Sequence, residues 1–159
     1  MCGGCHGSAD VAPPPRMPHL AGQQPEFLVL QMFLMREGLR IVPEMKGLLD
    51  GWSDAELESA AAYFAAQKPA AARPVRNDKL HARGQQLSRT MGCNSCHMTD
   101  YSGQRQVPKL AGQREDYLAL SMKAYRDNKR VGADTQMNGI MSGVADADIE
   151  ALAHFFAQQ

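Results

Sequence analysis

The sequence has no surplus of either charge, because 17 basic side chains balance 17 acidic ones. Without a basic surplus, neither nucleic acid nor an acidic membrane surface is indicated as the main partner. Its longest apolar stretch, from Phe27 to Met35, contains a glutamine and is too short to cross a bilayer. We therefore expect no transmembrane segment, an expectation that leaves docking to a membrane complex open.

Aromatic residues are also scarce, at 6% of the chain, and no stretch shows the alternation typical of strands. Two small cores built from such a sequence would be short of bulky side chains, which leaves room for a bound group. Cysteine occurs only in two Cys-x-x-Cys-His strings, Cys2–His6 and Cys93–His97. None is left over for an ordinary disulfide.

The two strings belong to a longer internal repeat. The stretch "PHLAGQQPEFL" (18–28) matches "PKLAGQREDYL" (108–118), and "EMKGLLDGWSDAELESAAAYFA" (44–65) matches "QMNGIMSGVADADIEALAHFFA" (136–157). Between the halves, a segment rich in proline and alanine without apolar periodicity is typical of a linker. We predict a first domain over 1–68, a linker over 69–79 and a second domain over 80–159.

Each half is predicted to be helical, which makes the fold all-α. Apolar residues recur at helical spacing over 25–38 and 114–128. Ser53, with Glu56 three positions later, predicts a capping box at the start of the last helix of the first half. A further helix expected over 77–92 has no counterpart in the first half, so we expect that Met1 is not the natural start of the protein.

The Cys-x-x-Cys-His string is typical of covalent haem attachment. Its two thiols can add to the two haem vinyl groups, while the adjoining imidazole reaches the iron from one face. The chain is therefore predicted to carry two covalently bound haem c groups. The thioether links are expected at Cys2, Cys5, Cys93 and Cys96, and the histidine ligands at His6 and His97.

Zinc binding and dithiol exchange are the alternatives to haem, because Cys-x-x-Cys serves both. A shared zinc site would require the two pairs to meet across far more sequence than the roughly 15 to 20 residues usual in zinc ribbons. It would also leave both histidines of the strings without a role. The repeated histidine favours haem.

A haem iron that only transfers electrons commonly takes a methionine thioether as its sixth ligand. Met45 and Met137 lie at matched positions of the repeat, in what we expect to be a loop across the distal haem face. Met141 is the rival in the second half. Its counterpart is Leu49, so we expect Met141 to pack in the core.

Other residues are predicted to support these ligands. A metal-bound histidine nearly always donates its second ring N–H to an acceptor, and a carbonyl near Pro18 or Pro108 can supply one. Arg40, Arg130 and Lys109 are candidates to neutralise haem propionates, with exposure to solvent as the alternative. Three histidines have no match in the other half and are interpreted as surface or structural residues: His19, His81 and His154. The aromatic residues expected to pack against haem or in the core are Phe27, Trp52 and Tyr117.

Through "CGGCHG", "PHLAGQ", "PEM", "CNSCH", "PKLAGQ" and "QMNGIM", the chain resembles dihaem class I cytochromes c of the cytochrome c4 type. The resemblance covers nearly the whole chain and implies two tandem class I cytochrome c domains with His/Met ligation. Carried over, the axial pairs would be His6 with Met45 and His97 with Met137. A proline-rich "APPPRM" loop departs from the pattern, which suggests that the first haem is more exposed or is covered by a partner.

The resemblance implies a periplasmic electron carrier between respiratory complexes, terminal oxidases or other redox proteins. An export signal is not present in the sequence as given, so the location is inferred from the chemistry of haem attachment. Two alternatives stay open: an electron-accepting cytochrome subunit of a dehydrogenase complex, and a dihaem enzyme with one open haem iron. Six-coordinate iron leaves no place for substrate, which favours a carrier that is not an enzyme.

Overall fold

The computed structural model describes residues 2–7, 11–69, 74–130 and 135–159. Over these residues it contains helices and no strand, and Gln104 and Val107 form an isolated bridge. The helices are α1 (Gly3–His6), α2 (Pro25–Arg36), the 3-10 helix η1 (Pro43–Met45), α3 (Asp54–Ala65), α4 (Asp78–Thr90), α5 (Cys93–His97), α6 (Glu115–Arg126), α7 (Thr135–Met141) and α8 (Asp146–Ala157). The predicted all-α class is confirmed.

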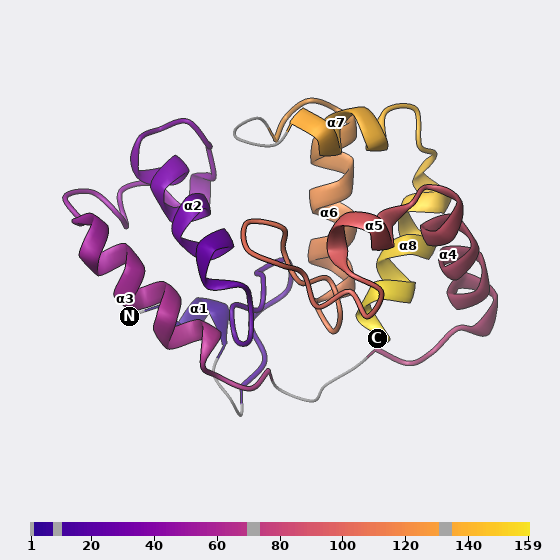
Figure 1. Cartoon of the computed structure of the whole chain (residues 1–159), viewed down its shortest axis with the longest axis horizontal. Coiled ribbons are helices and arrows are strands. Elements are labelled where there is room, and N and C mark those ends of the chain that lie inside the picture. Colours follow the sequence, from indigo (N-terminus) through magenta and orange to yellow (C-terminus); the bar gives the residue numbers. More distant parts are fainter. Residues whose placement is uncertain (1, 8–10, 70–73, 131–134) are drawn as a thin grey trace.

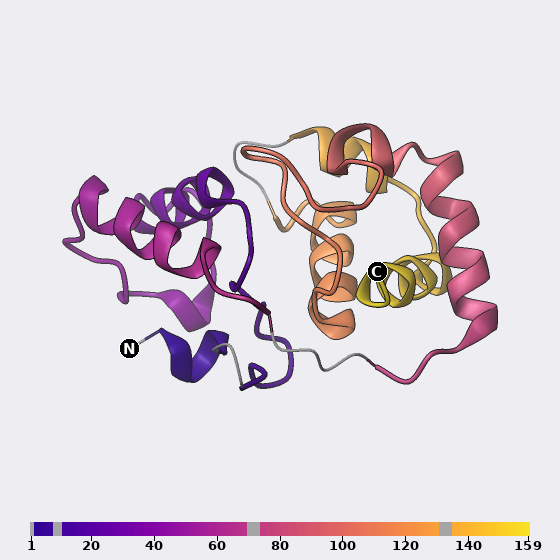
Figure 2. The ribbon, with the colours of Figure 1, turned by 60° about the horizontal axis from the view of Figure 1, so that its bottom comes forward.

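The helices form two groups that follow the two halves of the sequence (Figures 1 and 2). Helices α1 to α3 lie on one side, α4 to α8 lie on the other, and the coils that precede α2 and α6 meet between them. Residues 70–73 of the predicted linker lie outside the described residues. Helix α4 begins at Asp78, two residues before the predicted start of the second domain.

In the second half, α8 is packed between α4 and α6. Gly84 permits the close approach of α4, because a Cβ at that position would lie 2.1 Å from the carbonyl oxygen of Ala151 in α8. Beside this crossing, the buried hydroxyls of Ser88 and Tyr101 are hydrogen-bonded at 2.8 Å. The contact between α4 and α8 thus depends on small side chains and one satisfied polar pair.

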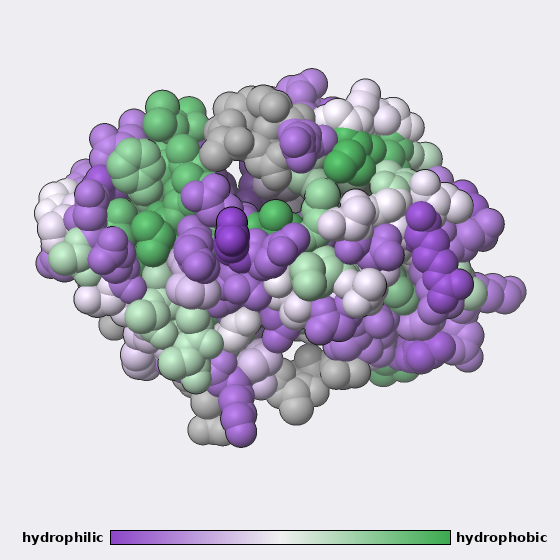
Figure 3. All heavy atoms as spheres, in the orientation of Figure 1, coloured by the Kyte–Doolittle hydropathy of each residue, from purple (hydrophilic) through white to green (hydrophobic). Residues whose placement is uncertain are grey.

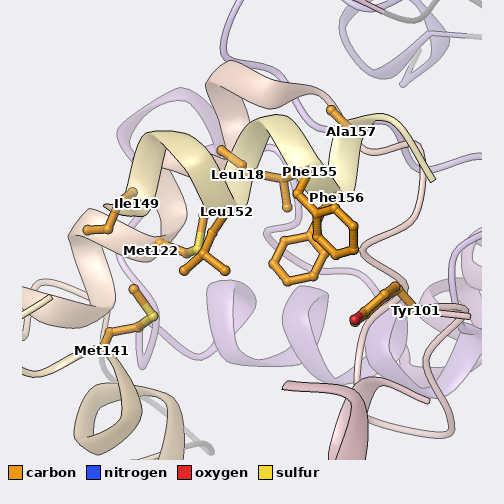
Figure 4. Close-up of a cluster of buried hydrophobic side chains, with 10 residues drawn as sticks. Tyr101, Leu118, Met122, Met141, Ile149, Leu152, Phe155, Phe156 and Ala157 are labelled. Atoms are coloured by element: carbon orange, nitrogen blue, oxygen red, sulfur yellow. The ribbon is translucent and has the colours of Figure 1, made fainter. Parts of the chain in front are cut away.

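The two halves have apolar cores of different size. In the second half the core gathers around α8, whose residues 151–157 are all buried, and Figure 4 shows Phe155 and Phe156 pointing toward Tyr101. In the first half the buried cluster consists of Leu28, Ala61 and Phe64. The described core is therefore concentrated in the second half.

Local signals explain where the helices begin. The predicted capping box of α3 is present: the Ser53 hydroxyl accepts from the Glu56 backbone N–H at 3.3 Å, and the Glu56 carboxylate accepts from the Ser53 N–H at 2.7 Å. Asn77 caps α4 through the backbone N–H groups of Lys79 and Leu80. Helix α2 starts with Pro25, whose missing N–H costs nothing at that position.

Among the described residues, no helix is both long enough and apolar enough to cross a membrane.

Candidate functional site

The first Cys-x-x-Cys-His string forms the short helix α1 and ends in a buried histidine. His6 is 9% exposed, and its Nδ1 lies 3.2 Å from the carbonyl oxygen of Pro18. Burial lowers the pKa of His6, and the hydrogen bond to Pro18 opposes this shift. The chain turns away at Gly7, where φ is +78° and a Cβ would meet the Val11 carbonyl oxygen at 2.6 Å.

The second string repeats this geometry in α5. His97 is 6% exposed, and its Nδ1 lies 2.8 Å from the carbonyl oxygen of Pro108. Because a carbonyl can only accept, Nδ1 carries the proton in both histidines. The lone pair of each ring is thereby placed on Nε2, the tautomer that a metal ligand requires. The predicted acceptors near Pro18 and Pro108 are confirmed.

The cysteines of both strings are thiols with no disulfide between them. Cys5 and Cys96 are exposed, whereas Cys2 and Cys93 are half-buried. Burial raises the pKa of the Cys93 thiol, with smaller opposing contributions from hydrogen bonds. Within the described residues, which include all four cysteines, no three Cys, His, Asp or Glu side chains are gathered as a metal ion would need.

The candidate methionine ligands lie on different local structures. Met45 ends the 3-10 helix η1, and Met137 lies in α7, so the segment predicted as a loop in both halves is helical at each methionine. Both side chains are half-buried, and Met137 packs against the core of the second half. Met141 is 2% exposed within that core, which confirms its expected packing role.

Matched arginines close the segments that carry these methionines. Arg36 at the end of α2 donates to the carbonyl oxygen of Trp52 at 2.7 Å, and Arg126 at the end of α6 donates to that of Val144 at 3.2 Å. Arg126 is also paired with Asp146. Each arginine therefore ties the helix before the methionine segment to the start of the helix after it. The two arginines occupy matching positions of the internal repeat.

The second methionine segment has an additional anchor. The Asn138 side-chain amide donates to the carbonyl oxygens of Tyr125 at 2.8 Å and of Arg130 at 3.2 Å. Its position in the first half is taken by Lys46, which is exposed. The backbone next to Met137 is thus held by side-chain hydrogen bonds that the exposed Lys46 beside Met45 does not make.

Two arginines from the two halves meet at the boundary between them. Arg40 and Arg130 both donate to the side-chain oxygen of Gln31, and the Arg130 guanidinium lies 4.6 Å from the ring centroid of Tyr125. Among the described residues, neither arginine makes a salt bridge with an acidic side chain. Burial and the charge of Arg130 together lower the pKa of Arg40.

The positive charge of this arginine pair acts on a third residue. Burial raises the pKa of Tyr117, but Arg130 and Arg40 outweigh that effect and lower it to about 8. Surroundings that favour ionisation of a phenol favour other anions as well. Haem carries carboxylate propionates, so the positive charge beside Tyr117 fits the predicted cofactor. Arg40 and Arg130 are therefore suited to the propionate role predicted from the sequence. Lys109 lies elsewhere at the boundary, where its backbone is hydrogen-bonded to Gln23.

Two of the three histidines outside the two strings, His19 and His154, are buried. His19 is buried between the halves, where burial, Arg114 and Lys109 lower its pKa. His154, 2% exposed, accepts the Asn77 N–H through Nε2 at 2.9 Å, with the carboxylate of Glu115 3.0 Å from its Nδ1. It links α4, α6 and α8.

Comparisons with known proteins point in the same direction. The cytochrome c family model matches residues 81–159. The chain is 36% identical over 176 residues to cytochrome c4 of Stutzerimonas stutzeri, a match that covers 98% of this chain and 82% of that protein. It is 28% identical over 172 residues to a thiosulfate dehydrogenase electron acceptor of Thiomonas intermedia, with 99% and 78% covered.

A solved structure shares the whole arrangement. The reduced recombinant cytochrome c4 from Pseudomonas stutzeri superimposes with a TM-score of 0.86 at 34% identity. The match covers 98% of this chain and 92% of that one. The similarity therefore extends over both halves, including the first, which the family model does not match.

Proposed function

The chain belongs to the cytochrome c4 family of dihaem c-type cytochromes, and we propose that it passes single electrons between redox proteins through two His/Met-ligated haems. The observation that carries the proposal is the repeated anchoring of His6 and His97 by a backbone carbonyl. Each anchored ring presents Nε2 as the metal-binding nitrogen. Haem iron bound by such a ring supplies reversible one-electron chemistry.

The site residues are proposed as follows. Cys2 and Cys5 hold the first haem and Cys93 and Cys96 the second, each through thioether links. His6 and Met45 would ligate the iron of the first haem, and His97 and Met137 that of the second. Their positions support this assignment, because each methionine lies in a segment closed by an arginine. Residues 1–68 and 80–159 are proposed as the two domains, joined by 69–79.

The chain's own residues set the conditions for electron transfer. Arg40 and Arg130 offer positive charge to the propionates at the boundary between the halves. A methionine ligand to each haem iron would raise its potential and leave no open position for substrate. The protein is accordingly proposed to be a carrier and not an enzyme.

Covalent haem attachment takes place where reduced thiols and haem meet outside the cytoplasm. We therefore place the protein in the periplasm. The intact mass of protein made with a haem-maturation system should exceed that of the bare chain by two haems, and acid–acetone should extract neither. A mass increase of a single haem would show that only one of the two strings carries haem.

Methionine ligation is tested by substitution. Met45→Ala and Met137→Ala should each lower the reduction potential of one haem and change its spectrum, because a thioether ligand is lost. Met141→Ala is the matched control, since Met141 packs in the core and should leave both potentials unchanged. A lowered potential in Met141→Ala with none in Met137→Ala would reverse the assignment.

A role as the electron-accepting subunit of a dehydrogenase is the second candidate. It is favoured by the similarity to the thiosulfate dehydrogenase electron acceptor of Thiomonas intermedia. Co-purification of a dehydrogenase subunit with the native protein would support it. Isolation of the protein alone, with rapid reduction by several unrelated donors, would favour the mobile carrier.

A further inference from the structure

Two buried glutamines cross between the halves in the same way. The Gln113 side chain accepts from the His19 backbone N–H at 2.8 Å and donates to the His19 carbonyl oxygen at 2.8 Å. Gln23 does the same to Lys109, accepting at 2.7 Å and donating at 3.1 Å. The exposed fractions of Gln23 and Gln113 are only 6% and 8%. Each glutamine therefore holds one residue of the opposite half by both of its backbone polar groups.

The backbone groups that the glutamines hold belong to the peptides that anchor the histidines. In the Pro18–His19 peptide, the carbonyl accepts from His6 Nδ1 while the N–H donates to Gln113. In the Pro108–Lys109 peptide, the carbonyl accepts from His97 while the N–H donates to Gln23. A single peptide unit thus separates each histidine from a glutamine of the other half.

Hydrogen bonds in such a chain polarise one another. A peptide whose N–H is donated to an acceptor has a more negative carbonyl oxygen, which is a stronger acceptor for the imidazole N–H. A stronger bond at Nδ1 makes the imidazole a more basic ligand, and a more basic ligand stabilises oxidised iron. The glutamine therefore acts on the ligand through the peptide without touching it.

We propose that Gln113 is a positioning residue for His6 and Gln23 for His97, so that each half tunes the haem of the other. This inference rests on the proposal that His6 and His97 bind iron. Its distinctive consequence is a crossed effect. A change in the second half should act on the first haem, and a change in the first half on the second.

The experiment compares Gln113→Met and Gln23→Met in the full-length holoprotein. The two potentials are resolved by redox titration, and the Nδ1–H resonances of the ligand histidines are followed by NMR in the reduced state. Gln113→Met should raise the potential of the first haem and shift the His6 signal upfield, with the second haem unchanged. Gln23→Met should do the same to the second haem and His97.

A matched control separates this role from simple loosening of the boundary. Gln24 also crosses between the halves, donating to the carbonyl oxygens of Ser102 at 2.9 Å and Gly103 at 3.2 Å. It does not touch either ligand-anchoring peptide, so Gln24→Met should leave both potentials in place. Equal shifts in Gln24→Met and Gln23→Met, or a shift of the haem in the same half as the substitution, would overturn the proposal.

A second substitution covers the case in which Gln113→Met does not fold. Gln113→Glu keeps an acceptor for the His19 N–H and adds negative charge, so it should lower the potential of the first haem. A raised or unchanged potential in Gln113→Glu would also overturn the proposal.

The holoprotein without substitutions distinguishes failure of histidine ligation from failure of the glutamine effect. If it shows no pair of haem-shifted imidazole signals, histidine ligation fails. If those signals are present but none of the glutamine variants moves them, the crossed tuning alone fails.

Discussion

The two halves repeat one pattern with unequal support. In the second half, α4 covers α8, and Phe155 is 3% exposed beneath it. The matching residue on α3, Tyr63, is 63% exposed, and the described residues of the first half place no helix over it. Both histidines are nevertheless anchored alike. The orientation of each histidine is therefore set by the short coil before each Leu-Ala-Gly-Gln turn, while the stability of each half depends on the surrounding helices.

The outer surfaces of the halves also differ. Figure 3 shows hydrophobic surface over α2 and the loop that follows it. Phe33 is 38% and Leu39 is 56% exposed there, whereas their counterparts in the second half are Lys123 and Lys129. An apolar face and a face of charged side chains suit different partners. The duplication thus yields two similar haem sites with dissimilar approaches.

The largest effect is expected where α4 packs on α8, a contact that the described first half lacks. Gly84→Ala places a methyl group 2.1 Å from the Ala151 carbonyl oxygen, so α4 must move away from α8. We expect the second half to lose about 3 kcal/mol of stability, measured by hydrogen exchange of α8 in the holoprotein. Gly139→Ala is the control, because a Cβ there meets nothing within 4 Å. Equal exchange in both variants would show that the crossing contributes little.

A smaller effect is expected at the methionine segments. Asn138→Ala removes the hydrogen bonds that fix α7 to the end of α6, a loss of about 1–2 kcal/mol. The second haem should then bind added imidazole roughly tenfold more tightly, because Met137 is displaced more easily. Lys46→Ala, at the matched exposed position, should leave the first haem unchanged. Equal imidazole affinity before and after Asn138→Ala would show that Asn138 does not hold Met137 in place.

The smallest effect concerns the helix starts. Ser53→Ala removes the cap of α3 and should cost about 1 kcal/mol in the first half. The matched position before α8 is Ala145, which has no side-chain cap, so Ala145→Ser should stabilise α8 by up to about 1 kcal/mol. Hydrogen exchange of α3 and α8 measures both changes. We expect the stability changes of the two variants to have opposite signs. Loss of stability in both variants would contradict the difference in capping between α3 and α8.

Much of this arrangement was predictable from local patterns. The capping box of α3 and the helices over 25–38, 77–92 and 114–128 were expected, and the structure contains α2, α4 and α6 within those ranges. Their ends differ by one or two residues because helix termini are the weakest sequence signal. The carbonyl acceptors were expected because a metal-bound histidine needs one.

Other features depend on contacts that sequence alone does not specify. The repeat shows that Gln23 and Gln113 match, but not that each reaches into the opposite half. The role of Gly84 follows from the approach of α8, and that of Asn138 from the end of α6. The methionine segments were expected as loops across the distal haem face, yet local turns close into η1 and α7.

The most direct test of the central claim is the methionine–iron charge-transfer band of the oxidised holoprotein, measured against its haem iron. The account predicts one band equivalent for each of two haems, one lost in Met45→Ala, one in Met137→Ala and both in the double variant. A resting protein with high-spin iron in either half, or with a band that survives the double substitution, would contradict it.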